Sequence, residues 1–291
     1  MKWVFTIAAA IALTFNSSVA DAKTANRCAP SILAMTYNIR LDIASDGAVD
    51  WAHRKDFLIS QIAFLRPDIL SMQEVLPNQR SDLEQAFPDY VFVGGGRDDG
   101  KLAGEASPLA IKRQLFTIEK QGTFWLSPTP DIPSLGWDAA YKRVVTWARL
   151  KRASDGQPLL VLSTHWDNEG KDARKASAAL ILRWIKANIG RHDRLILLGD
   201  FNAEADEPSI AALLNDRLGL ADSRSVASEG SVGPQISFNG FDAFPKSGGV
   251  IDHIFVGPGI AVRRHSVIAQ HIDGRVASDH FPVAALLDVC R

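Results

Sequence analysis

The sequence has no excess of charge of either sign. Its 32 Lys and Arg residues balance 33 Asp and Glu residues, and the sequence pI is about 6.7. A protein that grips duplex nucleic acid through many phosphates has a strongly basic surface, so the balance argues against that class and leaves only local basic patches open. The chain also lacks internal repeats, charge runs and Pro/Ser-rich linkers. With an ordinary 46% of hydrophobic and 22% of charged residues, these absences predict one globular domain over residues 23–291.

Long apolar runs are also scarce, and the run at the N-terminus is too short to span a membrane. Lys2 precedes this run, which covers residues 4–15, and small residues follow up to Ala20 and Ala22. The order is typical of a signal peptide. We therefore expect residues 1–22 to be removed, with cleavage after Ala20 or Ala22. The mature chain is then predicted to be secreted or periplasmic, with no transmembrane segment.

Cysteine is rare, and the two cysteines, Cys28 and Cys290, lie near the two ends of the mature chain. An exported protein meets an oxidising compartment, in which the two can form a bridge that ties the ends together and restrains the unfolded chain. Two unpaired, buried thiols are the alternative. The sequence leaves both open.

Nine short apolar or β-branched segments are predicted as strands. Several are apolar on both faces, which is typical of strands in a sheet that is covered on both sides. They cover residues 32–37, 69–72, 90–93, 109–111, 144–150, 159–163, 195–198, 251–256 and 283–287.

Three stretches between these strands are predicted as helices. Their markers are Leu58, Ile62 and Leu65 before Pro67, then Ala176, Leu180 and Trp184 before Gly190, and finally Asp206 with Pro208 in the first turn. Because several strands follow one another directly, the order indicates an α/β fold. We predict a four-layer α/β sandwich, in which two packed mixed β-sheets are flanked by helices.

Residues 94–104 and 127–137 are rich in turn-forming residues and are predicted as surface loops. Residues 95–102 nearly match the phosphate-cradling P-loop. However, Leu102 stands where that motif needs a hydroxyl group for magnesium, and no clear helix follows. We interpret the segment as a flexible loop.

Polar side chains follow apolar strands at six places, where the last residues of a sheet can point into a cleft. Asn38 and Glu74 occupy the first two. A hard divalent cation prefers carboxylate and amide oxygens, and magnesium keeps several waters, so one or two protein oxygens suffice. Glu74 is the best single candidate ligand. Either residue taken alone is more typical of a turn or cap, so only the joint occurrence of all six places indicates function.

The next two places hold His165 and the pair Asp200 and Asn202. His165 follows a short apolar strand, and Asp167 comes two positions later. The two-residue period of a strand would put Asp200 and Asn202 on one side, facing one space. Asp200 is then a candidate to orient or deprotonate a water, and Asn202 to donate to a phosphate oxygen. An Asx turn after a buried strand is the alternative for this segment.

The last two places supply an Asp and a His for acid–base chemistry. Asp279 and His280 are adjacent, so they converge only if a loop carries them. A His oriented by a carboxylate is the arrangement that a general base requires, and Asp252 is the candidate partner of His280. His253 should point to the opposite face from Asp252, and we interpret it as structural.

The six segments that carry these polar residues, in this order along the chain, resemble the motifs of the endonuclease/exonuclease/phosphatase (DNase I-like) superfamily. The similarity covers essentially all of the mature sequence. The positions that match the superfamily's motifs are Asn38, Glu74, His165, Asp200, Asn202, Asp252, Asp279 and His280. The middle of the chain is similar to the secreted bacterial branch related to nocturnin and deadenylase enzymes, through residues 104–105, 124–127, 136–140, Arg143 and 146–147. Asn168 departs from the pattern, which often has a His there.

The resemblance implies a hydrolase that cleaves a phosphate ester by metal-assisted attack of water. It assigns Mg²⁺ or Mn²⁺ to Glu74, with Asn38 and Asp279 beside it. The activation of water falls to Asp200 and to the Asp252/His280 pair, with the division of the base role left open. Stabilisation of charge on the phosphoryl oxygens falls to His165, Asn202 and Arg143. Arg143 and Glu105 are the weaker assignments.

The substrate stays open among nucleic acids, nucleotides, sugar or inositol phosphates and phospholipid head groups, as a monoester or a diester. The balanced charge argues mildly against a duplex nuclease. A noncatalytic binding protein on the same fold is the alternative from another class, and it is disfavoured because all eight motif positions carry residues capable of the chemistry. No stable protein partner is implied.

Overall fold

The structure is a computed structural model that describes residues 31–289 of the chain. The predicted signal peptide over residues 1–22 and the two alternatives for Cys28 and Cys290 lie outside the described residues. Among residues 31–289, no helix is both long enough and apolar enough to cross a membrane.

The first sheet has seven strands in the order β10-β12-β13-β1-β2-β4-β3. In its middle, β1 runs parallel to β2, with Asn38 beside Gln73 in the register, and antiparallel to β13. The carboxyl ends of β1 and β2 therefore open on the same edge. The bounds are β1 Ile32–Asn38, β2 Ile69–Gln73, β3 Tyr90–Val93, β4 Leu109–Lys112, β10 Ser231–Val232, β12 Ile260–Val267 and β13 Val283–Val289.

The second sheet has six strands in the order β5-β6-β7-β8-β11-β9. Because β7 and β8 are parallel, His165 pairs in register with Asp200, and the antiparallel β11 brings Asp252 opposite Asp200. Three predicted site residues thus lie level across three strands. The bounds are β5 Phe116–Trp125, β6 Val144–Arg152, β7 Pro158–His165, β8 Arg194–Asp200, β9 Ala221–Asp222 and β11 Asp252–Val256.

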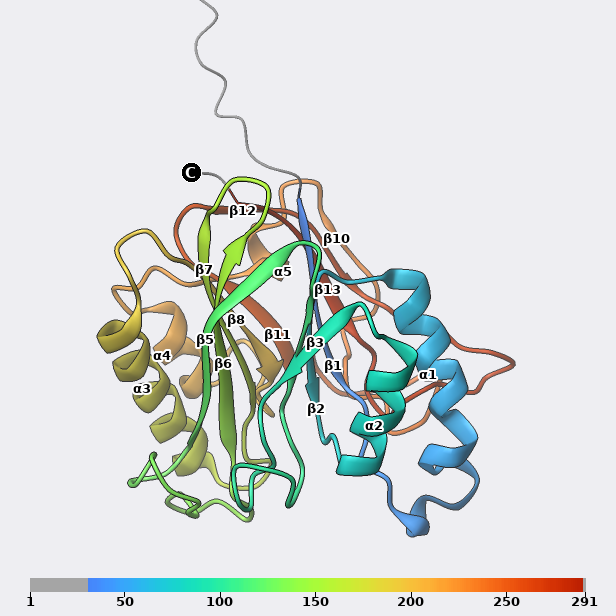
Figure 1. The fold of residues 1–291 in the computed structure, drawn as a ribbon. Coiled ribbons are helices and arrows are strands. Elements are labelled where there is room, and N and C mark those ends of the chain that lie inside the picture. The colour runs from blue at the N-terminus through green and yellow to red at the C-terminus, as the bar shows by residue number, and fades with distance from the viewer. Residues whose placement is uncertain (1–30, 290–291) are drawn as a thin grey trace, which may run out of the picture.

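Helices cover the outer face of each sheet (Figure 1). The first sheet is covered by α1 Trp51–Leu65 and α2 Pro77–Ala86, and the second by α3 Lys171–Asn188 and α4 Pro208–Leu214. Two short elements, η1 Ala44–Val49 and α5 Ser223–Val226, join the larger ones. The predicted four-layer α/β sandwich is confirmed.

Strand β8 illustrates why the central strands are apolar on both faces. Ile196 and Leu198 belong to the core between the two sheets, whereas Leu195 and Leu197 pack toward the helices of the outer layer. A fully buried side chain of this size stabilises the fold by roughly 1.5–3 kcal/mol relative to exposure. The continuous apolar run is therefore a direct consequence of burial on both sides.

All nine predicted strands are present, and four shorter or less regular ones were missed. Residues of β5 and β12 are mostly exposed or half-buried and include several charges, so no apolar run marks these strands. The same holds for α2, which buries only Gln79 and Leu83. The predicted stripe on α3 was partly wrong, because Ile181 and Ile185 are fully buried while Trp184 is only half-buried. The predicted loops over 94–104 and 127–137 contain no helix or strand element.

Candidate active site

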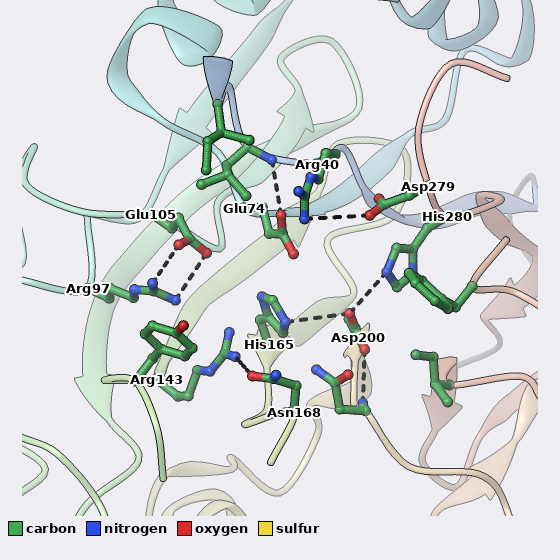
Figure 2. A pocket seen from close by; sticks show the side chains of 16 residues that line it. Arg40, Glu74, Arg97, Glu105, Arg143, His165, Asn168, Asp200, Asp279 and His280 are labelled. Carbon is green, nitrogen blue, oxygen red and sulfur yellow. Dashed lines mark hydrogen bonds and ion pairs between the residues drawn. The ribbon is translucent and has the colours of Figure 1, made fainter. Parts of the chain in front are cut away.

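A pocket of about 500 Å³ opens at the edge where β1, β2, β7 and β8 end (Figure 2). Side chains from both sheets point into it. The predicted residues that line it are Glu74, Arg143, His165, Asp200, Asn202, Asp279 and His280. The two others, Asn38 and Asp252, are buried and hydrogen-bonded to residues that line it. The prediction that all six polar places follow a strand is wrong at the last two, because Asp252 begins β11 and both Asp279 and His280 precede β13.

Asn38 holds Glu74 and Asp200 together across the gap between the sheets. Its Nδ2 donates to Glu74 Oε1 at 3.1 Å and to Asp200 Oδ2 at 3.0 Å. Its Oδ1 accepts the backbone N–H of Arg40 at 3.0 Å. A cation would have to bind this Oδ1, which already accepts a hydrogen bond. The contacts of Asn38 are therefore those of a residue that orients Glu74. A ligand role for Asn38 stays a prediction.

The residues around Glu74 fit a hard divalent cation. Leu41 donates its backbone N–H to Glu74 Oε2 at 3.0 Å, so both carboxylate oxygens are held in place and each keeps a free lone pair. Ligand atoms of Glu74, Glu105 and His165 lie within 4.8 Å of one another. Asp279 lines the same pocket, and burial raises the pKa of its carboxyl. An oxygen-rich donor set of this kind suits Mg²⁺ or Mn²⁺.

Asp200 lies at the centre of the acid–base residues, between two histidine rings. Its Oδ2 lies 3.5 Å from His165 Nε2 and 3.7 Å from His280 Nε2. On the far side of the His280 ring, Nδ1 lies 2.8 Å from Asp252 Oδ2, which is the predicted pair. All four side chains are buried. His280 is therefore held between two carboxylates and is shielded from solvent.

This arrangement shifts the proton affinities in opposite directions. Burial, and then the charge of Asp252, raises the pKa of Asp200 to about 7. Burial alone would lower the pKa of His280, but the charges of Asp252 and Asp200 outweigh it and raise the pKa to about 10. For His165, burial and the nearby Arg143 charge hold the pKa well below its usual value. At neutral pH the site thus has one protonated and one neutral histidine.

Asn202 reaches the pocket in a way that differs from the prediction. Strand β8 ends at Asp200, and the backbone N–H of Asn202 donates to Asp200 Oδ1 at 2.9 Å, which is the Asx-turn alternative. Asn202 has a left-handed φ of 47°, and its Nδ2 donates to the backbone carbonyl of Trp166 at 2.9 Å. A turn rather than the strand period places it in the pocket, with the second N–H of its amide still free to donate.

Basic residues line the wall opposite His280. Arg143 is buried, its Nη2 donates to Asn168 Oδ1 at 2.8 Å, and its Nε lies 3.5 Å from Asp167 Oδ2. Arg97 binds Glu105 through two hydrogen bonds of 3.0 and 2.5 Å. Both guanidinium groups also lie against the ring of Tyr141, that of Arg97 at 5.0 Å and that of Arg143 at 5.6 Å from its centroid.

Strained backbone is concentrated at the pocket. Seven non-glycine residues between 31 and 289 have a positive φ, and three of them, Arg40, Glu74 and Asn202, line this pocket. Left-handed backbone costs a non-glycine residue on the order of 1–3 kcal/mol and persists where surrounding contacts enforce it. Its concentration here is typical of a functional site.

Two other polar residues near the predicted site have structural roles. His253 points away from the pocket, with Nδ1 at 2.9 Å from Asp222 Oδ2 and Nε2 at 3.0 Å from the carbonyl of Ala203, as predicted. Asp167 lies beyond the end of β7 and accepts the backbone N–H of Gly170 at 2.8 Å. It supports Arg143 and does not face the pocket.

Four charged or aromatic lining residues were missed from the sequence: Arg40, Arg97, Tyr141 and Phe238. Arg40 lies two residues after Asn38, and this proximity was the only local signal. Phe238 is 48% exposed and lies edge-on to His280, with ring centroids 5.1 Å apart. Arg97, Tyr141 and Phe238 come from irregular segments, in which no periodic pattern exists.

Comparison with known proteins matches residues 35–280 to the Endonuclease/Exonuclease/phosphatase family. A member of this family from Bacteroides vulgatus is 34% identical, with a TM-score of 0.85 over 90% of this chain and 100% of that one. A mannosyl-6-phosphatase from Bacteroides thetaiotaomicron is also 34% identical, with a TM-score of 0.84 over 88% and 99%. The catalytic domain of human nocturnin, 19% identical with a TM-score of 0.69 over 89% and 94%, shares the fold. The chain therefore belongs to the endonuclease/exonuclease/phosphatase family and is a hydrolase that acts on phosphate-ester bonds.

Proposed function

We propose that the chain is a secreted, Mg²⁺- or Mn²⁺-dependent phosphatase whose substrate is the phosphate monoester of a small polar molecule, such as a sugar phosphate. The observation that carries this proposal is the convergence of one acidic cluster, one Asp–His pair and several arginines on a single pocket of about 500 Å³. A pocket of this size suits a small ligand. The 34% identity with a mannosyl-6-phosphatase and the balanced net charge support the same substrate class.

The cation would be held by Glu74 and Asp279, with Asn38 fixing the orientation of Glu74. When bound, such a cation polarises a phosphoryl oxygen and neutralises part of its negative charge. Glu105 is a further candidate on the other side of Glu74, although Arg97 already occupies both of its oxygens.

The substrate phosphate would be bound by the wall opposite His280. Arg143 supplies a guanidinium that neighbouring oxygens already orient, and a guanidinium matches phosphate oxygens better than an ammonium does. The free N–H of Asn202 and the neutral ring of His165 add donors beside it. These groups stabilise the charge that develops on the phosphoryl oxygens.

We assign the general base to Asp200. Its Oδ2 faces the pocket between the two histidine rings, so it can accept a proton from the attacking water as the oxygen bonds to phosphorus. His280, flanked by carboxylates on both nitrogens, stays protonated, and its Nδ1–H donates to Asp252 Oδ2 at 2.8 Å. Asp252 holds the ring in this orientation. The alcohol leaves with the electron pair of the broken P–O bond and takes its proton from water.

The test is hydrolysis by the purified mature chain, with EDTA, Mg²⁺ or Mn²⁺. The substrates are p-nitrophenyl phosphate, mannose 6-phosphate, inositol phosphates, bis-p-nitrophenyl phosphate, single- and double-stranded DNA, RNA and sphingomyelin. The proposal expects metal-dependent release of phosphate from monoesters and little turnover of polymers. Faster cleavage of the diester or a nucleic acid would favour the nuclease alternative, and turnover that is unchanged in EDTA would refute the metal dependence.

Export is tested separately, because it does not depend on the reaction. The full chain and a chain without residues 1–22 are each expressed in a Gram-negative host, and the periplasm and cytosol are assayed by immunoblot. The proposal expects the full chain alone to reach the periplasm, shortened by 20 or 22 residues in its mass spectrum, as the predicted cleavage sites require. Retention of both chains in the cytosol would refute it.

A further inference from the structure

Arg54, in the first turns of α1, is buried beneath the loops that carry the pocket residues. It is 3% exposed. Its guanidinium lies against the rings of Trp51 and Phe241, at 5.2 and 5.9 Å from their centroids. The proposed reaction assigns no role to this residue, and Arg54 does not line the active-site pocket.

All five N–H groups of the Arg54 guanidinium donate to backbone carbonyl oxygens. A guanidinium has five donors and no acceptor, so this side chain is fully used. The acceptors belong mainly to two segments that are far apart in the sequence, residues 39–41 and residue 277. The bonds are from Nε to Val49 at 3.0 Å, from Nη1 to Ile39 and to Ala277 at 3.2 Å, and from Nη2 to Arg40 at 2.5 Å and to Leu41 at 3.3 Å.

The first segment leads to the metal side of the pocket. Arg40 has a left-handed φ of 57°, which is uncommon for a residue with a side chain. In this conformation the next backbone N–H, that of Leu41, donates to Glu74 Oε2 at 3.0 Å, and the Arg40 guanidinium lies 3.7 Å from Asp279 Oδ2. Arg54 thus binds all three carbonyl groups of the turn whose Leu41 N–H binds Glu74.

The second segment leads to the acid–base side. The carbonyl of Ala277 directly precedes Ser278, whose Oγ donates to the backbone carbonyl of Asn38 at 2.7 Å. Asp279 and His280 follow at once, and the backbone N–H of His280 donates to Ser278 Oγ at 3.4 Å. A shift of the Ala277 carbonyl would therefore move His280 relative to Asp200.

We propose that Arg54 is a positioning residue for the active site, which fixes Glu74 and His280 relative to each other by binding both of their segments with one rigid planar group. Its kinetic consequence rests on the proposed function, whereas the tie between residues 39–41 and residues 277–280 holds for any substrate. Lysine cannot replace it, because one ammonium nitrogen has three donors and cannot span carbonyl groups on several sides of a plane.

The experiment compares Arg54→Lys and Arg54→Gln with the control Arg152→Lys. Arg152 is also a buried arginine that donates to a carbonyl, that of Val289 at 2.8 Å, but it lies on β6 away from the pocket. Hydrogen exchange is followed by mass spectrometry on peptides that cover residues 38–43 and 276–282. In parallel, kcat and KM are measured with p-nitrophenyl phosphate and Mn²⁺, and folding is checked by circular dichroism.

In the folded Arg54→Lys variant we expect exchange to rise together in both peptides, by about 10-fold or more. We also expect kcat to fall about 100-fold, because a shift of about 1 Å in a catalytic group has effects of this size, with little change in KM. Arg152→Lys should alter neither peptide and leave kcat unchanged.

Faster exchange in one peptide alone, or in neither, would overturn the proposal. An unchanged kcat in the folded Arg54→Lys variant would do the same. Loss of the fold in both Arg54 variants, with Arg152→Lys folded, would assign Arg54 to the core and would also overturn it. If the wild type does not hydrolyse the ester, the proposed function fails, and the exchange data alone then decide whether Arg54 ties the two segments.

Discussion

Replacement of Asp252 by Asn tests the Asp–His pair with a nearly isosteric change. The substitution removes one negative charge at the 2.8 Å contact with His280 Nδ1 and leaves the shape of the buried cluster intact. In the wild type the Asp252 charge is the largest contribution that raises the pKa of His280. We therefore expect the ring to lose its proton at a lower pH and to turn more freely.

The expected magnitude follows from burial and charge. A hydrogen bond to a charged group contributes about 1.5–3 kcal/mol, and both partners here are buried. If that energy is realised in the transition state, kcat falls about 10- to 150-fold. The alkaline limb of the pH–rate profile should also move to lower pH, because His280 in the variant deprotonates below its wild-type pKa of about 10.

The chain contains a matched control for this experiment. Asp222 and His253 form a second buried Asp–His pair with a contact of 2.9 Å, but His253 faces the carbonyl of Ala203 rather than the pocket. Asp222→Asn should lower the melting temperature and leave kcat unchanged. Initial rates between pH 5 and pH 10 and thermal unfolding are measured for both variants. A folded Asp252→Asn variant with wild-type kcat, or equal losses of kcat in both variants, would refute the reasoning.

Three further predictions concern the metal, the phosphate and stability. Glu74→Gln should lower kcat by more than about 100-fold and abolish Mn²⁺ binding in titration calorimetry. The control Glu119→Gln, on an exposed part of β5, should bind Mn²⁺ normally. Retained Mn²⁺ binding in Glu74→Gln would contradict the assignment of Glu74 as a ligand. Arg143→Lys should lower kcat/KM about 10- to 100-fold, because an ammonium cannot match two phosphate oxygens at once; an unchanged value would exclude Arg143 from phosphate binding. Burial lowers the pKa of His265 to about 4, below its usual value near 6.5. As the pH falls, the imidazole of His265 therefore takes up its proton in the unfolded chain before it does so in the folded protein. The free energy of unfolding should therefore fall by up to about 3 kcal/mol as the pH drops from 6.5 to 4, and His265→Gln should weaken this dependence in urea titrations; an identical pH dependence would count against it.

Several features of the fold were readable from local sequence. Strands buried on both faces, such as β8, are continuous apolar runs because each side chain meets a packed layer. The polar residues that end those runs, such as Asp200, stand out because the pattern changes abruptly at the edge of a sheet. Their joint order along the chain also led to the family. Elements with a half-exposed pattern, such as β5 and α2, carry no such contrast and were missed.

The conformation at strand ends was less predictable than the strands themselves. The two-residue period was the wrong reason for placing Asn202 beside Asp200, because the chain leaves the strand at Asp200 and turns with a left-handed residue. Positive φ values at Arg40 and Glu74 were likewise not readable, since neither residue type favours them. Such conformations are enforced by tertiary contacts.

The sequence by itself determined the residue types of the site, the order of the strands that carry them and the class of chemistry that they permit, because neighbouring residues encode periodicity and its interruption. Only the tertiary structure decided which of those residues meet. Asn38 and Asp200 are 162 positions apart, and the bond between them exists because two sheets pack face to face. Arg54 ties residues 39–41 to residue 277 because α1 covers the sheet in which β1 and β13 are neighbours. Contacts of this kind depend on how distant segments pack, and no local pattern specifies them.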